Sequence, residues 1–295
     1  MTATAAKSWR GAPVVRIAGV VLGATCLAAA VAGCAPDAPL SDPEGVSVAL
    51  YQTRSDVAAG VLEIQVVNDG PTPLVVTRAA YRGPEFVEVL IWQGTGSTVH
   101  AGHRLDLPVA LVDVSCDERS THAATVELTI VRDGREHTVT RTPSDPFGQV
   151  ERLREEGCFA ASLAELGELR ITRLDPPDAA GDAAHLVFEA DPTGESGYTV
   201  TAARSTTLVS PAVDGVGRDE APLAWRVAAG ANQWALPIVP TRCDPHAVLE
   251  DKQGTLIPLS VERDDGVTGR LVVAASAEIR AQILDYVASS CGFSS

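Results

Sequence analysis

Short runs in which apolar and polar residues alternate recur along most of this chain, and they constrain its fold more than any other feature. In the first half they cover residues 46–52, 60–70, 73–81, 104–114 and 124–134. In the second half they cover residues 168–174, 184–190, 198–204, 255–266 and 269–275. A period of two, with Gly, Asp and Asn between the runs, is typical of half-buried antiparallel strands. Because no long helical segment separates the runs, we expect a mainly all-β fold of immunoglobulin-like β-sandwiches and no parallel α/β sheet.

The chain also contains two copies of one pattern. Residues 105–123 and residues 234–247 both lead from a Leu-Pro-apolar strand into Cys-Asp, with a His-Ala pair shortly after. Each copy continues with a strand, a charged hairpin turn and a short amphipathic helix that ends at a cysteine. We therefore predict two tandem sandwich domains, at residues 46–160 and 161–295, each closing on a short C-terminal helix. The second domain is then an internal repeat of the first.

The N-terminus has the pattern of a secretory signal. A basic segment precedes an uncharged apolar run at residues 17–33, which leads into Cys34 in the motif "VAGC". This motif resembles the lipobox of bacterial lipoproteins of an actinobacterial-like kind, and the arginine-rich, lysine-poor composition is a bias of the kind that a GC-rich genome produces. The resemblance implies that residues 1–33 are a signal peptide and that Cys34 is lipidated. It also implies that the folded part lies on the outer face of the cytoplasmic membrane.

The membrane is thus an expected partner, reached through the lipid anchor. An uncleaved transmembrane segment is the alternative, although an apolar run of this length is at the short limit for a bilayer. Residues 34–45 are rich in Pro, Asp and Ser, which indicates an extended tether.

The remaining cysteines are expected to form disulfides, because this location is oxidising. Cys34 takes the lipid and one cysteine lies in the signal, which leaves four cysteines, two in each repeat. Four cysteines allow three pairings. The repeat selects Cys116–Cys158 and Cys243–Cys291.

The stretch "TRCDPHAVLEDKQG" at residues 241–254 gathers the groups most suggestive of chemistry. A cysteine nucleophile with His246 as its base would need the Cys243 thiol, which the predicted disulfide removes. Carboxylates and imidazole also suit a divalent metal, but no second histidine follows at ligand spacing. We therefore expect no catalytic residue and no metal site here. The alternative is a metal site whose ligands are Asp244, His246, Glu250 and Asp251.

Composition limits the classes of function. A net charge of −15 argues against nucleic acid as a partner, since phosphate binding needs a basic surface. The chain has no linear motif of a serine hydrolase, a phosphate-binding loop or a zinc protease. A carboxylate pair for glycoside hydrolysis leaves no linear trace, so this class stays open. Trp225 and Trp234 could form a binding platform if exposed, but Trp92 holds a comparable place in the first copy, which favours a role in the core.

These observations predict a lipoprotein that is not an enzyme and needs no cofactor. Its expected role is that of a non-catalytic binding or scaffolding module that contacts another protein of the cell envelope. The alternative is a metal- or small-ligand-binding lipoprotein that uses the loop at residues 243–252.

Overall fold

The computed structural model describes residues 43–117, 122–179, 181–192, 194, 196–230, 232–249 and 251–293. The predicted signal peptide, the predicted lipidation site Cys34 and most of the predicted tether lie outside these residues. The described chain is mainly β and all of its strand pairs are antiparallel. Its buried apolar side chains form two separate clusters, one for each β-sandwich.

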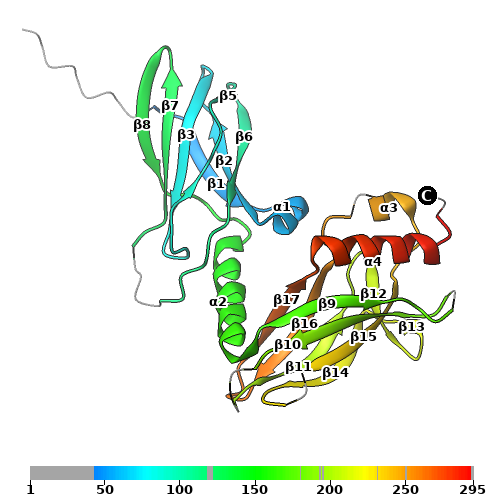
Figure 1. Ribbon diagram of the computed structural model, residues 1–295. Coiled ribbons are helices and arrows are strands. Elements are labelled where there is room, and N and C mark those ends of the chain that lie inside the picture. The colour runs from blue at the N-terminus through cyan, green and yellow to red at the C-terminus, as the bar shows by residue number, and fades with distance from the viewer. Residues whose placement is uncertain are drawn as a thin grey trace, which may run out of the picture. The chain divides into compact units, whose positions relative to one another are not determined.

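Two sheets face each other in the first sandwich (Figure 1). The first sheet has the order β1-β2-β6, with the bounds Val46–Tyr51, Val61–Asn68 and His103–Ala110. The second has the order β4-β3-β7-β8, with the bounds Leu90–Ile91, Leu74–Arg82, Thr125–Arg132 and Arg135–Arg141. A short strand β5 (Ser97–Val99) also pairs with β3. Every second side chain of β2 is buried, so Leu62, Ile64 and Val66 face the core as the alternation predicts.

The second sandwich is built in the same way. One sheet has the order β13-β12-β15-β10-β9, with the bounds Val216–Gly217, Val209–Val213, Gln233–Pro240, Ala184–Ala190 and Leu169–Asp175. The other has the order β14-β11-β16-β17, with the bounds Glu220–Val227, Tyr198–Arg204, Leu256–Arg263 and Thr268–Ala274.

The two sandwiches share their strand pairing. The order β1-β2-β6 corresponds to β9-β10-β15, and β3-β7-β8 corresponds to β11-β16-β17. These are the A-B-E and C-F-G pairings of an immunoglobulin-like sandwich. Even an irregularity recurs, because the register of β3 shifts at Thr77 and that of β11 shifts at Thr201. Each threonine hydroxyl donates to a carbonyl of the facing strand, at 3.1 Å for Thr129 O and 3.2 Å for Ser260 O.

Four helices accompany the strands in the described part of the chain, and none of them is long and apolar enough to span a membrane. They are α1 (Arg54–Ala59), α2 (Gln149–Gly167), α3 (Pro245–Leu249) and α4 (Ala277–Ser290). At the start of α2 the Asp145 carboxylate accepts hydrogen bonds from the backbone amides of Gln149 and Val150, both at 2.9 Å. These bonds satisfy two of the amides that a helix leaves free at its first turn.

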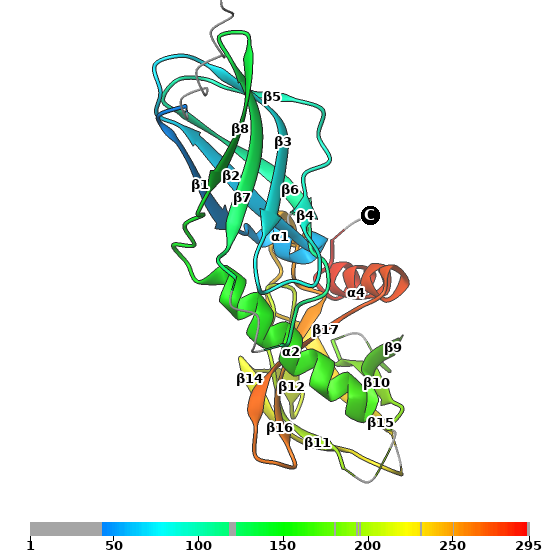
Figure 2. The same cartoon turned by 90° about the vertical axis from the view of Figure 1, so that its left-hand side faces the viewer.

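The helix that closes the first sandwich is longer than expected. It has 19 residues and continues past Cys158, so the predicted boundary at residues 160 and 161 falls inside it (Figure 2). Residues 159–166 are mostly Ala, Leu, Ser and Glu and contain no Gly or Pro, so nothing in them stops a helix. Val150 belongs to the first apolar cluster and Leu163 to the second, so one helix contributes to both cores.

Candidate functional site

The loop at residues 241–254 contains a disulfide. Cys243, which follows β15, is bonded to Cys291 directly after α4, with the two Cα atoms 5.2 Å apart. The thiol is therefore not available as a nucleophile or as a metal ligand. In this loop the structure shows the predicted pairing.

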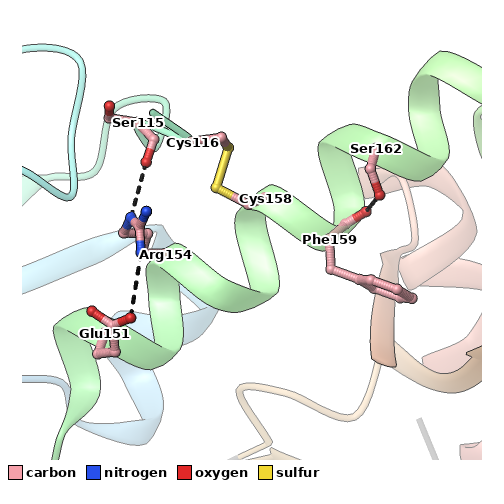
Figure 3. Close-up of a disulfide and its surroundings, with 7 residues drawn as sticks. All are labelled: Ser115, Cys116, Glu151, Arg154, Cys158, Phe159 and Ser162. Atoms are coloured by element: carbon pink, nitrogen blue, oxygen red, sulfur yellow. Dashed lines mark hydrogen bonds and ion pairs between the residues drawn. A yellow bond between two sulfur atoms is a disulfide. The ribbon is translucent and has the colours of Figure 1, made fainter. Parts of the chain in front are cut away.

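The second predicted disulfide is also present. Cys116, on the segment after β6, is bonded to Cys158 of α2, with a Cα–Cα distance of 5.6 Å (Figure 3). One turn before Cys158, the guanidinium of Arg154 donates to Ser115 O at 3.1 Å and contacts Glu151 at 3.4 Å. The disulfide and the arginine thus hold the same segment against α2. In the first sandwich the disulfide joins the segment after β6 to α2, and in the second it joins the segment after β15 to the end of α4.

The residues proposed as alternative metal ligands have other roles where they are described. The Asp244 carboxylate accepts a hydrogen bond from the His246 amide at 3.0 Å, which closes the turn into α3. The Asp251 carboxylate accepts hydrogen bonds from the Thr207 hydroxyl and, at 2.7 Å, from the Gly254 amide. Glu250 lies outside the described residues. Within the described ranges, no group of three or more His, Cys, Asp and Glu side chains could hold a metal ion.

The tryptophans of the second sandwich do not form an exposed platform. Trp225 is 9% exposed and belongs to the second core. Trp234 packs on it, with the two rings stacked at a centroid distance of 6.0 Å. Trp92 is likewise packed against the first core, as the comparison of the two copies predicts.

A hollow of about 710 Å³ lies between α2, β9 and β17, and we call it the α2–β17 groove. Strands β9 and β17 are the edges of their sheets, so each is paired on one side only. Eleven lining residues are Ala, Leu, Ile or Val, and they include Ala160, Ala164, Leu169, Ile171, Val272 and Ala274.

The four polar residues of the α2–β17 groove are all engaged within the chain. The Tyr198 hydroxyl donates to Gly167 O at 2.7 Å. Arg170 forms ion pairs with Asp191 at 2.5 Å and with Glu168 at 3.7 Å. The Ser276 hydroxyl accepts from the backbone amide at position 279, at 3.3 Å, and so caps α4. The side chains that line the groove are thus mostly aliphatic, and its polar side chains are engaged within the chain.

A second, smaller hollow of about 340 Å³ lies on the outer face of β1, β2 and β6. Phe147, which is 69% exposed, lies at its rim with Tyr51, and Arg104 and Asp106 of β6 contribute charge. The Asp106 carboxylate accepts a hydrogen bond from Gln65 Nε2 at 2.9 Å. Burial, followed by the interaction with the Asp106 carboxylate, raises the pKa of the Tyr51 hydroxyl.

Glu63 lies on the same outer face, directly opposite Tyr51 in the β1–β2 register. Burial, together with the charges of Asp56 and Asp106, raises the pKa of its carboxyl from 4.5 to about 7. Its Oε2 atom is buried and has no hydrogen-bond partner in the described part of the chain. The carboxyl thus titrates near neutral pH, where its neutral form can donate a hydrogen bond.

Sequence reasoning did not identify either hollow. The outer-face residues are visible in the sequence only as polar positions inside apolar runs, such as Glu63 and Gln65 of β2 and Asp106 of β6. Their proximity depends on the strand register, which places Gln65 opposite Asp106. The α2–β17 groove depends on the length of α2, which extends beyond the short helix that the sequence pattern predicts.

Comparisons with known proteins give no family for this chain. No protein-family model matches it, and no curated protein matches it. Among solved structures, the exo-chitosanase CsxA of Amycolatopsis orientalis is similar over 78% of this chain, at 12% identity and a TM-score of 0.19. This chain spans only 26% of that enzyme's length. A protein of unknown function from Porphyromonas gingivalis W83 matches 77% of this chain and 94% of its own, at 15% identity and a TM-score of 0.18. Likenesses this distant carry no argument about function.

Proposed function

We propose that the protein is a lipoprotein anchored at the outer face of the cytoplasmic membrane, where it acts as a non-catalytic binding or scaffolding module for another envelope protein. The two disulfides support an extracytoplasmic location, because such bonds persist in oxidising compartments and are rare in the cytosol. The lipobox-like motif at Cys34 supports the anchor.

The α2–β17 groove is the observation that carries the proposed protein contact. Small-molecule sites combine apolar walls with a few convergent polar groups that fix the ligand. Here Tyr198 and Ser276 already bond within the chain, Arg170 pairs with Glu168 and Asp191, and the other lining side chains are aliphatic. Apolar side chains of a partner protein fit such a surface, since they need no hydrogen bonds and gain about 25 cal/mol for each Å² removed from water.

Site-specific photo-cross-linking in native membranes tests this proposal. A photoreactive residue replaces Val272, which lines the groove and is 37% exposed. A matched control replaces Val216 of β13, which is 54% exposed and lies outside the groove. We expect a discrete protein adduct at position 272 only. The same set of adducts at both positions, or none at position 272, contradicts the proposed contact.

A pair of helix substitutions sharpens this test. Ala164→Glu keeps a good helix former but places a charge in the groove, where an apolar partner cannot solvate it. Ala281→Glu makes the same change on the exposed side of α4, away from the groove. We expect the first variant to abolish the adduct and the second to preserve it. An adduct that survives Ala164→Glu argues against the groove as the contact.

The anchor has its own measurement. The mass of the mature N-terminal peptide should correspond to an acylated Cys34 with residues 1–33 removed, and Cys34→Ser should release the chain from membranes. A membrane-bound chain that retains residues 1–33 without acyl groups would support the transmembrane alternative instead.

A further inference from the structure

We propose that the outer edge of β6 in the first sandwich accepts an extended strand from a partner protein, in the place where the second sandwich carries its own strand β12. The inference rests on the proposed role in protein binding, but it concerns a different surface from the α2–β17 groove. It arises from comparing the two repeats strand by strand.

The second sandwich shows how this edge is completed. Strand β12 pairs antiparallel with β15, with Ser210 opposite Val239. The amide of Thr241 donates to Leu208 O at 3.0 Å and continues this ladder. Residues at alternate positions of β15 therefore bond β12, and those between them bond β10.

The first sandwich has the corresponding strand but no equivalent of β12. Leu107-Pro108 of β6 and Leu236-Pro237 of β15 occupy the same place in the repeated Leu-Pro motif. Pro108 lies opposite Glu63 of β2, and Pro237 lies opposite His185 of β10. The connection before β15 spans residues 205–232, whereas that before β6 spans residues 83–102, which is eight residues shorter. In the residues that the structure describes, β6 pairs with β2 only.

The alternation of hydrogen bonds along β6 shows which of its backbone groups are available to another strand. The amide of Leu111 donates to Gly60 O at 2.8 Å, on the β2 side. Leu105, Leu107 and Val109 therefore bond β2, while the residues between them direct their backbone groups to the open edge. The position of Pro108 agrees with this alternation. Proline has no amide hydrogen, so it could not donate to β2, and it lies at a position that faces the open edge. The open edge thus presents the amides of Arg104, Asp106 and Ala110 and the carbonyls of these residues and of Pro108.

Charge indicates what kind of strand fits. By analogy with the Ser210–Val239 pair, a strand bound to β6 in the β12 register places its equivalent of Ser210 opposite Ala110. Four residues further along the bound strand, the position equivalent to Asp214 then lies opposite Asp106 of β6, because the two strands run antiparallel. Arg104, Asp106 and Glu63 all lie on this outer face, and a side chain opposite Asp106 on the bound strand would meet the Asp106 carboxylate. The partner strand is therefore expected to alternate apolar and polar residues and to carry a basic residue opposite Asp106.

A labelled peptide with the sequence of residues 206–214, "TTLVSPAVD", is the probe. Fluorescence anisotropy measures its affinity for the full chain, and hydrogen exchange locates its site. We expect the peptide to slow amide exchange in residues 103–112 and not in β1, at the opposite edge of the same sheet. Replacing its terminal Asp with Lys should strengthen binding about two- to fivefold, as for a favourable cross-strand pair. No protection in residues 103–112 overturns the proposal.

Backbone substitutions separate strand pairing from other modes of binding. Ala110→Pro removes an amide that the fold does not use and should weaken binding about five- to tenfold, the value of one hydrogen bond. Ala110→Ser keeps the amide and should bind as the unchanged chain does. If Ala110→Pro proves unstable, methylation of the peptide nitrogen at Ser210 tests the same ladder with the chain unchanged, and methylation at Val209 is its control. Equal affinities for the two methylated peptides overturn the proposal.

The remaining outcomes distinguish this inference from the proposed function. A chain that forms dimers, which Ala110→Pro converts to monomers, shows that the edge accepts a second copy and overturns the assignment to a partner protein. Failure of the peptide to bind, with the adduct at Val272 intact, overturns the β6 inference alone. Peptide binding with no adduct at Val272 supports β6 as the contact and argues against the groove.

Discussion

Replacing Glu63 with glutamine should stabilise the protein at pH 8 and have much less effect at pH 5. The pKa of Glu63 rises from 4.5 to about 7 on folding, mainly because the carboxyl is buried and secondly because Asp56 and Asp106 lie near it. The folded chain therefore binds this proton more tightly than the unfolded chain. The stability that this provides is full below pH 4.5 and is lost as the pH rises from 4.5 to about 7.

The size of the effect follows from that interval. A displacement of the pKa from 4.5 to about 7 corresponds to roughly 3 kcal/mol in full. Because the Glu63 side chain is only partly buried, solvent screening reduces this to about 1 kcal/mol. Glutamine resembles the neutral carboxyl in size and carries no charge. At pH 8 it therefore removes the cost of holding a carboxylate charge whose Oε2 atom is buried and unpaired.

The assay is denaturant unfolding of the unchanged chain and of Glu63→Gln at pH 5 and pH 8, followed by circular dichroism. Glu127→Gln on the exposed face of β7 is the matched control, because it removes a strand carboxylate from a different sheet. We expect a gain of about 1 kcal/mol at pH 8 for Glu63→Gln and no comparable gain for the control. A gain of the same size at both pH values, or a loss at pH 8, would refute the reasoning. A carboxyl carbon of Glu63 that titrates near pH 4.5 in an NMR experiment would also refute it.

Other substitutions test the framework of the two sandwiches. Replacing both Cys243 and Cys291 with serine should lower the free energy of unfolding by roughly 4 kcal/mol, because the bridge closes a loop with a sequence separation of 48; unfolding midpoints with and without reductant measure this loss. Asp145→Ala should cost about 1 kcal/mol, since it leaves two first-turn amides of α2 without partners, and amide exchange at the start of α2 should accelerate. Gly197→Ala should destabilise the second sandwich by more than 1 kcal/mol, because a Cβ atom there lies 1.9 Å from Val227 O, and a thermal melt unchanged from that of the parent chain would contradict this.

Local pattern was sufficient to predict the sandwich architecture. Strand β2, for example, is bounded by turn residues and alternates its burial, so it carries its own signal. The disulfide pairing required a longer-range argument. It could be predicted because the two copies place their cysteines equivalently, and duplication restricts the possible partners of Cys116 and Cys243.

Strands that lack this pattern were not predicted. Strand β12 is five residues long, contains Pro211 and has four buried residues in succession, so it shows neither alternation nor length. Proline is tolerated there because Pro211 lies opposite Ile238, between the hydrogen-bonded pairs of the ladder. The cluster around Glu63 was missed for a related reason, since residues on three strands meet only once their register is fixed.

The features that suggest function arise where the two repeats differ. Cys291 ends α4, but Cys158 lies in the middle of α2, and the turns after it carry Ala160, Ala161 and Ala164 into the wall of the α2–β17 groove. Leu163, on the same turns, is 2% exposed in the second core, so this extension is fixed by packing and is not a frayed helix end. In the second sandwich α4 ends at its cysteine, whereas α2 continues for more than two turns beyond Cys158. For this reason we propose that the first protein contact is made by the surface that these extra turns create.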